Sequence, residues 1–382
     1  MTLAPAYILG ASMVRFAKHP DVSLSTLGAQ AAMGALEDAA IPPDRVEAAF
    51  VGSQWGGSMV GQRILKQTTM LGMPITNVEN ACSSGSTALR LARILVGAGV
   101  HEVVLAIGVD KLSVQSGPLP RHPEDFDGSL GLSPPALYAM RAKRYMHDHQ
   151  ATAEDLAAVC VKNRRHAVHN PFAQFRSETS VDEVLGSRMV ADPLTLLQCC
   201  SRADGAAAVV VVSEAVARRQ KERQPVRILA SSQCSGKYKP GFRDMTVPEI
   251  TERCAAKAYE EAAIAPGDID FAEVHDAFSI AELLYYEALG LCRRGEAVQL
   301  IRDGSTALGG RVPVNTSGGL IAKGHPPGAT GIAQVFEAVQ QLRGAAGPRQ
   351  VAGARLALTQ CTGGGVSGLD HGACTIHILA PA

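Results

Sequence analysis

Short apolar runs alternate along the chain with longer segments whose apolar positions recur at helical spacing. Four of these runs are Val103–Val109, Ala207–Val212, Phe271–Val274 and Arg355–Thr359. Continuous apolar runs of this length are typical of strands that are covered on both faces. The alternation therefore predicts an α/β protein in which buried strands lie between layers of helices.

One region breaks this alternation. It extends from about residue 115 to residue 202, opens with a stretch rich in proline, glycine and serine, and contains several histidines and arginines. Long irregular stretches inside a compact protein are usually functional. We therefore expect residues 115–202 to form an inserted loop domain.

The chain contains an internal repeat. The segment Ala35–Ile41 is echoed by Ala258–Ile264, and the register continues without a gap through the following apolar run. A helix–turn–strand unit that occurs twice indicates a duplicated α/β half. We place the N-terminal half at residues 1–114 with 203–230, and the C-terminal half at residues 231–382.

A second, looser echo aligns Cys82–Thr87 with His325–Thr330, with a glycine at the same place in each segment. Both segments precede a plausible helix. If the halves pack about a pseudo-two-fold axis, Cys82 and His325 lie at matching helix N-termini beside one cleft. The alternative is that alanine-rich helices resemble one another by chance.

Composition narrows the classes of function. The 382 residues include 36 basic and 36 acidic side chains, so no global field draws the protein to nucleic acid or a membrane surface. Nine cysteines without a Cys-x-x-Cys pair argue against both a disulfide framework and a zinc ribbon. The sequence shows no signal peptide, span-length apolar run or peroxisomal tripeptide. We expect a cytoplasmic protein without a resident metal or cofactor.

The first candidate for chemistry is Cys82, in the segment Asn80–Gly85. The composition of residues 86–92 favours a helix that begins just after this cysteine. A thiol at a helix N-terminus feels the positive end of the helix dipole, which favours the thiolate. Cys82 is therefore either a nucleophile or, as most free cysteines are, a buried structural residue.

His325 lies in the glycine-rich run Asn315–Gly331, where glycines permit the backbone to approach a ligand closely. A histidine at the start of the following helix tends to remain neutral, as a base or an oxyanion donor requires. The alternative is a histidine that only packs a loop.

His275 ends the short apolar run Phe271–Val274, where α/β folds present active-site groups. Its imidazole either points into the cleft or stacks on Phe278. The neighbouring Asp276 either orients a histidine or, more in keeping with its type, caps a helix.

Cys361 follows the run Arg355–Thr359 and opens the segment Cys361–Gly365. The glycines of this segment can expose backbone N–H groups that would bind an oxyanion. A simple glycine turn is the alternative.

These four motifs, in this order, resemble those of the thiolases, and more closely those of the sterol-carrier-protein-type thiolase branch. Further parts of the chain share the likeness, namely Val161–Gln174, Pro193–Cys200 with Asp204–Ala207, and Tyr285–Cys292. The resemblance covers nearly the whole chain. It implies the thiolase fold, in which two duplicated halves form a five-layer αβαβα sandwich and the loop domain covers coenzyme A.

Residue by residue, the resemblance makes Cys82 the nucleophile, His325 of Gly-His-Pro its activating base, and Cys361 of Cys-x-Gly the acid–base for the enolate carbon. His275 takes the place that asparagine holds in ordinary thiolases. Ala277 departs from the His-Asp-Cys-Phe motif of the branch.

The implied activity is cleavage or formation of a 3-ketoacyl-CoA through an acyl-enzyme, with coenzyme A as a substrate. His275 and His325 would donate hydrogen bonds to the enolate oxygen, and the backbone N–H groups of Cys82 and Gly363 would bind the oxyanion of the tetrahedral intermediate. Transfer of the acyl group to coenzyme A makes this a two-step, ping-pong reaction.

The resemblance also suggests where coenzyme A binds. Lys162, Arg164, Arg165 and His166 in the inserted region are candidates for its phosphates. The alternative is a solvated helix face.

As partners, the resemblance implies a homodimer or higher homo-oligomer and, in some relatives, a small zinc-ribbon/OB-fold protein. We expect residues 71–81 to include an edge strand that pairs across a two-fold axis, and loops 54–61, 115–135 and 234–244 to shape the acyl pocket. Two other functions stay open: a retro-aldol lyase acting on a β-hydroxyacyl-CoA, and a non-catalytic acyl-CoA-binding subunit of a complex.

Overall fold

The computed structural model describes residues 3–115, 124–237, 242–367 and 370–382, so parts of the predicted pocket loops 115–135 and 234–244 lie outside the described residues. Nine strands form one sheet in the order β3-β2-β4-β7-β1-β8-β11-β10-β9, and two short strands pair separately. The strands are β1 (Ala6–Met13), β2 (Ala48–Gly52), β3 (Ile75–Val78), β4 (Val103–Lys111), β5 (Met189–Ala191), β6 (Leu194–Thr195), β7 (Asp204–Ser213), β8 (Val226–Ser235), β9 (Phe271–Glu273), β10 (Ala357–Ser367) and β11 (Asp370–Pro381).

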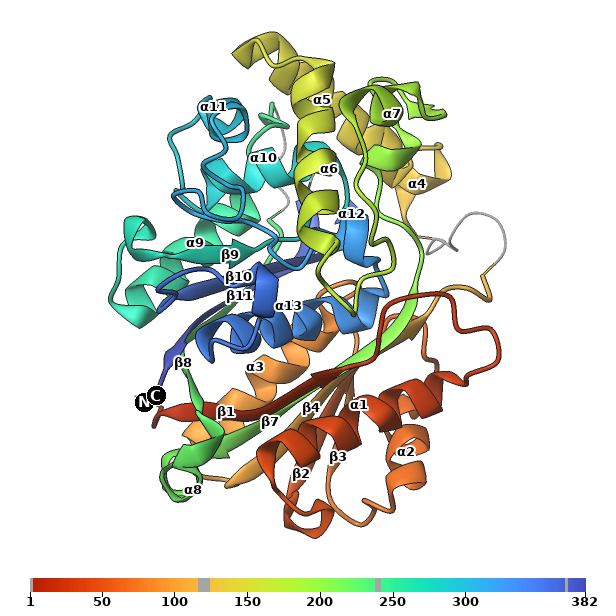
Figure 1. The fold of residues 1–382 in the computed structure, drawn as a ribbon. Coiled ribbons are helices and arrows are strands. Elements are labelled where there is room, and N and C mark those ends of the chain that lie inside the picture. Colours follow the sequence, from red (N-terminus) through yellow and green to blue (C-terminus); the bar gives the residue numbers. More distant parts are fainter. Residues whose placement is uncertain (1–2, 116–123, 238–241, 368–369) are drawn as a thin grey trace.

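Helices cover this sheet in layers (Figure 1). Helix α1 packs on one face of the β7, β1 and β4 strands, α3 and α13 pack together in the middle of the molecule, and α9 packs outside β8 and β11. The helices are α1 (Leu24–Ala39), α2 (Val60–Leu65), α3 (Ser84–Gly97), α4 (Phe126–Ser129), α5 (Pro134–His149), α6 (Ala153–Ala167), α7 (Val181–Gly186), α8 (Glu214–Arg219), α9 (Glu249–Ala262), α10 (Ser279–Ala288), α11 (Ala297–Arg302), α12 (Gly319–Lys323) and α13 (Pro327–Leu342).

The layers confirm the predicted αβαβα arrangement, with one refinement. The two halves of the sheet are joined where β1 pairs with β8 over only two positions, Tyr7 with Arg227 and Ile8 with Val226. Two backbone pairs are enough to make the sheet continuous while the parts on either side diverge around α3 and α13 (Figure 1).

The duplication is visible in the backbone. Helices α1 and α9 both end at an alanine in the left-handed conformation, Ala40 with φ of 51° and Ala263 with φ of 54°. A short 3₁₀ turn then begins at Pro43 in one half and at Pro266 in the other, and each leads into a buried parallel strand. The predicted helix–turn–strand repeat is confirmed.

The inserted region forms helices α4 to α7 and the β5–β6 pair beside the C-terminal half (Figure 1). Helix α6 begins at a capping box in which Thr152 and Asp155 exchange hydrogen bonds, and it packs against α10, α11 and α12. The exact limits proposed above for the three domains remain predictions.

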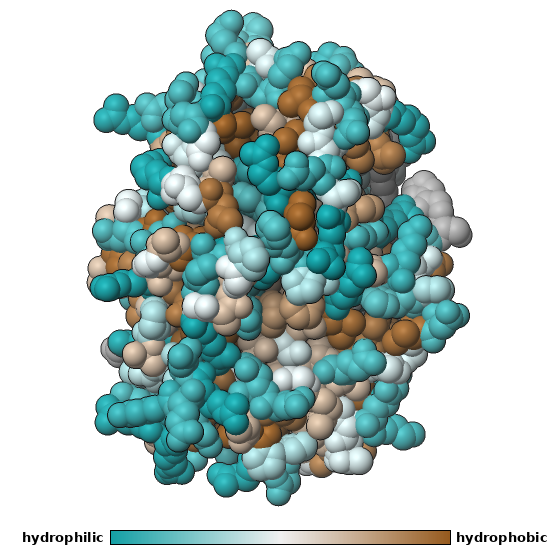
Figure 2. Space-filling view, viewed as in Figure 1, coloured by the Kyte–Doolittle hydropathy of each residue, from teal (hydrophilic) through white to brown (hydrophobic). Residues whose placement is uncertain are grey.

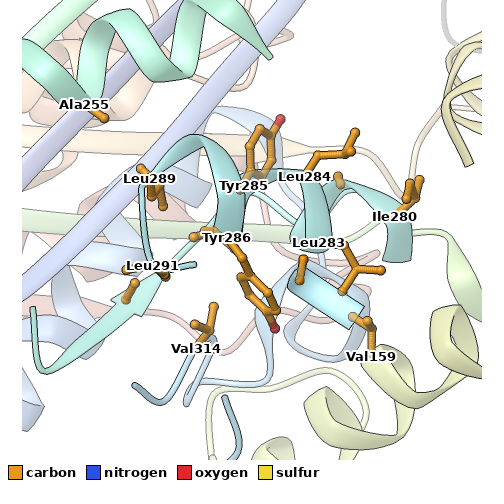
Figure 3. Packing of buried hydrophobic residues seen from close by; sticks show 14 of the residues in the cluster. Val159, Ala255, Ile280, Leu283, Leu284, Tyr285, Tyr286, Leu289, Leu291 and Val314 are labelled. Atoms are coloured by element: carbon orange, nitrogen blue, oxygen red, sulfur yellow. The ribbon is translucent and has the colours of Figure 1, made fainter. Parts of the chain in front are cut away.

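The interior is apolar and extensive. Figure 3 shows α10, whose side chains are buried around nearly its whole circumference, with the rings of Tyr285 and Tyr286 directed to different sides of the helix. The face of the molecule in Figure 2 mixes hydrophilic and hydrophobic positions. Among the described helices, none combines the length and apolarity that a membrane span needs.

Candidate active site

The loop that contains Cys82 meets the glycines of β10. Helix α3 begins at Ser84, two residues after Cys82, as the sequence predicted. Ala81 adopts the left-handed conformation with φ of 50°, which is uncommon for a residue with a Cβ. A Cβ at Gly363 would overlap the carbonyl oxygen of Asn80. Glycine at this position therefore lets β10 approach the cysteine loop at backbone distance.

The four residues that the sequence singled out come together. His325 Nε2 lies 3.2 Å from Cys82 Sγ, and Cys361 Sγ lies 3.1 Å from the carbonyl oxygen of Cys82. The rings of His275 and His325 are 5.0 Å apart and nearly perpendicular, at 81°. One thiol from the N-terminal half thus faces two imidazoles and a second thiol from the C-terminal half.

The hydrogen bonds around His325 define its tautomer. Its Nδ1 lies 2.8 Å from Thr330 Oγ1, and that hydroxyl in turn donates to the carbonyl oxygen of Pro326 at 3.0 Å. Because a hydroxyl has one proton, Thr330 must accept a hydrogen bond from Nδ1–H. Nε2 is then the basic nitrogen, and it faces the thiol of Cys82.

Hydrogen bonds hold the backbone and one ring nitrogen of His275, and its other ring nitrogen is open to the site. Its backbone N–H donates to Gln360 Oε1 at 3.0 Å, and its Nδ1 lies 3.3 Å from Thr362 Oγ1, which contacts the hydroxyl of Tyr285 at 3.0 Å. Its Nε2 is buried without a hydrogen-bond partner among the described residues. Of the two orientations considered above, the imidazole points into the site; Phe278 stacks on Tyr138 instead.

Burial sets the protonation of this group. Desolvation, followed by the charge of Asp110, raises the pKa of the Cys82 thiol to about 12, even though the residue as a whole is partly exposed. Burial lowers the pKa of His275 to about 4 and that of His325 well below its usual range. The resting pair is therefore a neutral thiol and a neutral imidazole. Desolvation of Cys82 thus acts against the helix dipole, which the sequence analysis expected to favour the thiolate.

Hydrogen bonding from the backbone N–H groups of Gly364 and of Cys82 itself lowers the pKa of the Cys82 thiol, against the larger effect of burial. The sequence pointed to Gly363, one residue earlier, as the second oxyanion donor. Gly364 has φ of +45°, which turns its N–H relative to its neighbours. The run of three glycines after Thr362 is the signal that could have included Gly364.

Asp110, at the end of β4, was missed by the sequence reasoning. Its buried carboxylate accepts hydrogen bonds from Ser53 Oγ at 2.8 Å, from the backbone N–H groups of Gln54 and Trp55, and from the N–H of Gly328 at 2.6 Å. Burial raises the pKa of Asp110 while these four donors oppose the rise. Gly328 lies in the first turn of α13, so one carboxylate ties both halves together beside the site.

Within the described part of the chain, the carboxylate of Asp276 has no hydrogen bond to a histidine, and it does not cap the helix that follows it in sequence. Its carboxylate accepts from the backbone N–H of Leu320 at 2.7 Å, in the first turn of α12, and from Asn163 Nδ2 at 2.8 Å. Capping is thus its role, but for a helix distant in the chain. Burial and the nearby Glu282 raise the pKa of Asp276 well above its usual range.

The four residues suggested for the phosphates of coenzyme A are divided by the structure. Lys162 is buried in an ion pair with Glu282 at 2.7 Å; His166 is buried between backbone groups of the C-terminal half, which lowers its pKa to about 3; and the guanidinium of Arg164 covers the ring of Phe175 at 4.4 Å. These three side chains are engaged internally: α6 turns Lys162 and His166 toward the C-terminal half, and Arg164 packs within the inserted region itself. Arg165 is exposed, and its contact with a phosphate stays a prediction.

Family models agree with this architecture. The model described as the N-terminal domain of thiolase matches residues 6–215, and the model described as a thiolase C-terminal domain-like unit matches residues 233–372. The chain therefore belongs to the thiolase family, and it is an enzyme of the acyltransferase class.

Relatives place it in the sterol-carrier-protein-type branch. It is 44% identical over 377 residues to the benzoylsuccinyl-CoA thiolase subunit BbsB of Thauera aromatica, covering 97% of this chain and 98% of that protein. Identity is 40% with an acetyl-CoA acetyltransferase of Methanothermobacter thermautotrophicus, with 98% of each covered. Human sterol carrier protein 2 is also 40% identical, over 94% of this chain and 69% of that protein.

Solved structures confirm the fold. An "Ltp2-ChsH2(DUF35) aldolase" superimposes with a TM-score of 0.87 at 27% identity, covering 100% of this chain and 99% of that one. Human mitochondrial 3-ketoacyl-CoA thiolase superimposes with a TM-score of 0.75 at 18% identity, with both chains fully covered. The second likeness concerns the fold alone.

Proposed function

We propose that the protein cleaves, or in reverse forms, a 3-ketoacyl-CoA through an acyl-thioester on Cys82 and passes the acyl group to coenzyme A. The observation that supports this most is the approach of His325 Nε2 to Cys82 Sγ at 3.2 Å with Cys361 beside them. A thiol, a base and a second acid–base group at contact distance are what covalent acyl transfer requires.

In the first half-reaction His325 Nε2 takes the thiol proton as Cys82 Sγ attacks the keto carbon. The N–H groups of Cys82 and Gly364 bind the resulting oxyanion. As the carbon–carbon bond breaks, the electron pair forms an enolate of the leaving thioester, whose oxygen accepts a hydrogen bond from His275 Nε2–H. Cys361 donates a proton to the enolate carbon, and acetyl-CoA, or its substituted analogue, leaves.

In the second half-reaction coenzyme A attacks the acyl-thioester on Cys82. Its thiol proton passes to the Cys361 thiolate left by the first half-reaction. The tetrahedral intermediate then collapses to release the acyl-CoA, and His325 returns its proton to the Cys82 thiolate. Each base begins the next cycle in its original protonation state. No resident cofactor enters this scheme, and coenzyme A acts only as a substrate.

Assembly is part of the proposal. The strand β3 forms one edge of the sheet and its four residues are at least partly exposed, so it is suited to pairing with a second copy in a homodimer. The name of BbsB as a subunit and the ChsH2(DUF35) component in the aldolase neighbour support a second, small partner protein. A cytoplasmic location stays our prediction.

The aldolase neighbour also supports a second candidate, cleavage of a β-hydroxyacyl-CoA without a covalent intermediate. Such a reaction needs no nucleophilic sulfur. The close contact between Cys82 and His325 therefore favours the thiolase reaction.

Mass spectrometry of peptides after brief incubation with a panel of 3-ketoacyl-CoA and β-hydroxyacyl-CoA esters tests both. Aromatic, branched and dicarboxylic chains should be included. We expect a mass gain on the Cys82 peptide with a 3-ketoacyl-CoA, and its loss when coenzyme A is added. Turnover of a β-hydroxyacyl-CoA with no acylated Cys82 would overturn the proposal in favour of the aldolase.

A further inference from the structure

Three potential metal ligands converge at the catalytic thiol. Cys82 Sγ and one ring nitrogen each of His275 and His325 all lie within 4.8 Å of one another, and this is the one such cluster of cysteine, histidine or carboxylate groups found among the described residues. In a tetrahedral zinc site a sulfur and a nitrogen ligand lie about 3.5 Å apart, given the usual bond lengths. The 3.2 Å between Cys82 Sγ and His325 Nε2 is close to that separation.

The nitrogen of His275 is available for such a bond. His275 Nε2 is buried, its residue is 4% exposed, and it has no partner among the residues that the structure describes. A buried polar atom without a partner indicates a ligand that the protein is built to receive. In the reaction that ligand is a substrate oxygen, but an imidazole nitrogen with a free lone pair binds a transition metal equally well.

The hydrogen-bond partners of the two imidazoles resemble those of metal-bound histidines. Metal-bound histidines usually donate their second ring N–H to an oxygen, which fixes the ring and the tautomer. Here both second nitrogens meet threonine hydroxyls, His325 Nδ1 at Thr330 and His275 Nδ1 at Thr362. Because the Thr362 hydroxyl can rotate, His275 can present either N–H to an oxyanion or a lone pair to a metal.

We propose that Cys82, His275 and His325 form a three-ligand site for Zn²⁺, and that zinc binding there reversibly inactivates the enzyme. Zn²⁺ replaces the proton of the Cys82 thiol, so one proton is released for each zinc–sulfur bond formed. Two neutral imidazoles complete the protein ligands, and water fills the fourth position. The bound thiolate can no longer attack a substrate.

Isothermal titration of the purified enzyme with Zn²⁺, in two buffers of different ionisation enthalpy, measures stoichiometry and proton release together. We expect one zinc per site with about one proton released. Enzyme alkylated at Cys82 should lose this binding, and His275→Ala should weaken it by more than the 10–100-fold that loss of an outer-shell partner costs. Cys292→Ser, which removes a partly exposed thiol elsewhere, is the matched control and should bind like the wild type.

Titration with Cd²⁺ gives an independent signature, because a cadmium–thiolate bond adds ultraviolet absorption that should vanish on alkylation of Cys82. Zinc binding that survives both alkylation and His275→Ala would overturn the site. These measurements contain no substrate, so they stand apart from the proposed reaction. Only the claim of inactivation rests on that function, and it requires that a chelator restore the activity which zinc removes.

Discussion

The two halves share one fold and divide the chemistry unequally. In the repeat, Gly52 at the end of β2 corresponds to His275 after β9. Strand β4 pairs with β2 as β10 pairs with β9, so Gly108 on β4 is the counterpart of Cys361 on β10. A Cβ at Gly52 would overlap the backbone of Ser84 at the start of α3. The N-terminal half thus uses these positions to admit helix termini, and the C-terminal half uses them to present catalytic side chains.

Their interiors differ in the same way. Phe50 of β2 is an apolar core residue, whereas its counterpart Glu273 is fully buried beside Lys323 and receives the N–H and hydroxyl of Ser317. A buried charge must be satisfied by specific partners, so it fixes geometry in a way that an apolar contact does not. The segment between β9 and α13, which presents His325, is therefore held by ionic contacts at a position where the N-terminal half has the apolar contacts of Phe50.

The largest effect should come from removing the one nucleophile that the N-terminal half supplies. Cys82→Ala should lower kcat/KM for a 3-ketoacyl-CoA by about 10⁴-fold or more, because no other group forms the acyl-thioester. Steady-state assays with mass detection of products measure this loss. Cys292→Ser should retain wild-type rates, and full turnover by Cys82→Ala would place the nucleophile elsewhere.

The next largest effect should come from breaking a buried ion pair in the C-terminal half. Arg349→Ala leaves Glu337 buried without its 3.0 Å partner and should lower the free energy of unfolding by about 3–5 kcal/mol. Arg218→Ala removes an exposed pair with Glu214 and should leave the free energy of unfolding nearly unchanged. Chemical denaturation compares them, and equal losses would contradict the contrast drawn between buried and exposed ion pairs.

The kinetics of a His275 variant test whether the C-terminal half supplies the side chain that stabilises the enolate. His275→Ala should slow carbon–carbon cleavage by roughly 10²–10³-fold, as expected for an oxyanion donor. Acyl transfer from Cys82 to coenzyme A uses the backbone N–H groups instead and should suffer much less. Rapid-quench measurement separates the two half-reactions; equal losses in both would mean that His275 only supports its loop.

The close approach of Gly52 to the start of α3 predicts a smaller change in the free energy of unfolding. Gly52→Ala forces a methyl group against the backbone of Ser84 and should cost about 1–3 kcal/mol. Gly267→Ala is the matched control in the other half, since no atom lies within 4 Å of the added Cβ. Thermal unfolding of the two variants side by side gives the answer, and a neutral Gly52→Ala would show that the helix terminus can move.

The smallest effect concerns the resting protonation of the thiol. Because the pKa of Cys82 is raised, the thiol is protonated at neutral pH, and its alkylation by iodoacetamide should accelerate steadily as pH increases above about 8.5. A preformed thiolate–imidazolium pair would instead react at a constant rate through neutral pH. Mass spectrometry of the Cys82 peptide over a pH series distinguishes the two, and a plateau near pH 7 would refute the neutral pair.

Sequence reasoning reached the features that depend on local pattern. The repeat, the α/β layers and the convergence of Cys82, His275, His325 and Cys361 followed from periodicity, motif and resemblance, and the coordinates bear out that geometry. Their individual catalytic roles remain predictions.

Features set by contacts between distant segments were not accessible. Asp110 joins the two halves through its hydrogen bond from the backbone of α13. Lys162 turns inward because it forms an ion pair with Glu282 of α10. The desolvation that opposes a thiolate at Cys82 was hidden for the same reason, because a helix terminus is visible in sequence whereas burial by the opposite half is not.

The carboxylate of Asp110 has a consequence for the order in which the molecule is made. Three of its four donors are supplied by its own half, but the fourth, Gly328, leaves the ribosome more than two hundred residues later. Domains generally fold from the N-terminus as they are synthesised. A nascent chain therefore holds the loop at residues 53–55 around an acid that lacks one donor, and acquires a working catalytic centre only after the C-terminal half has been made.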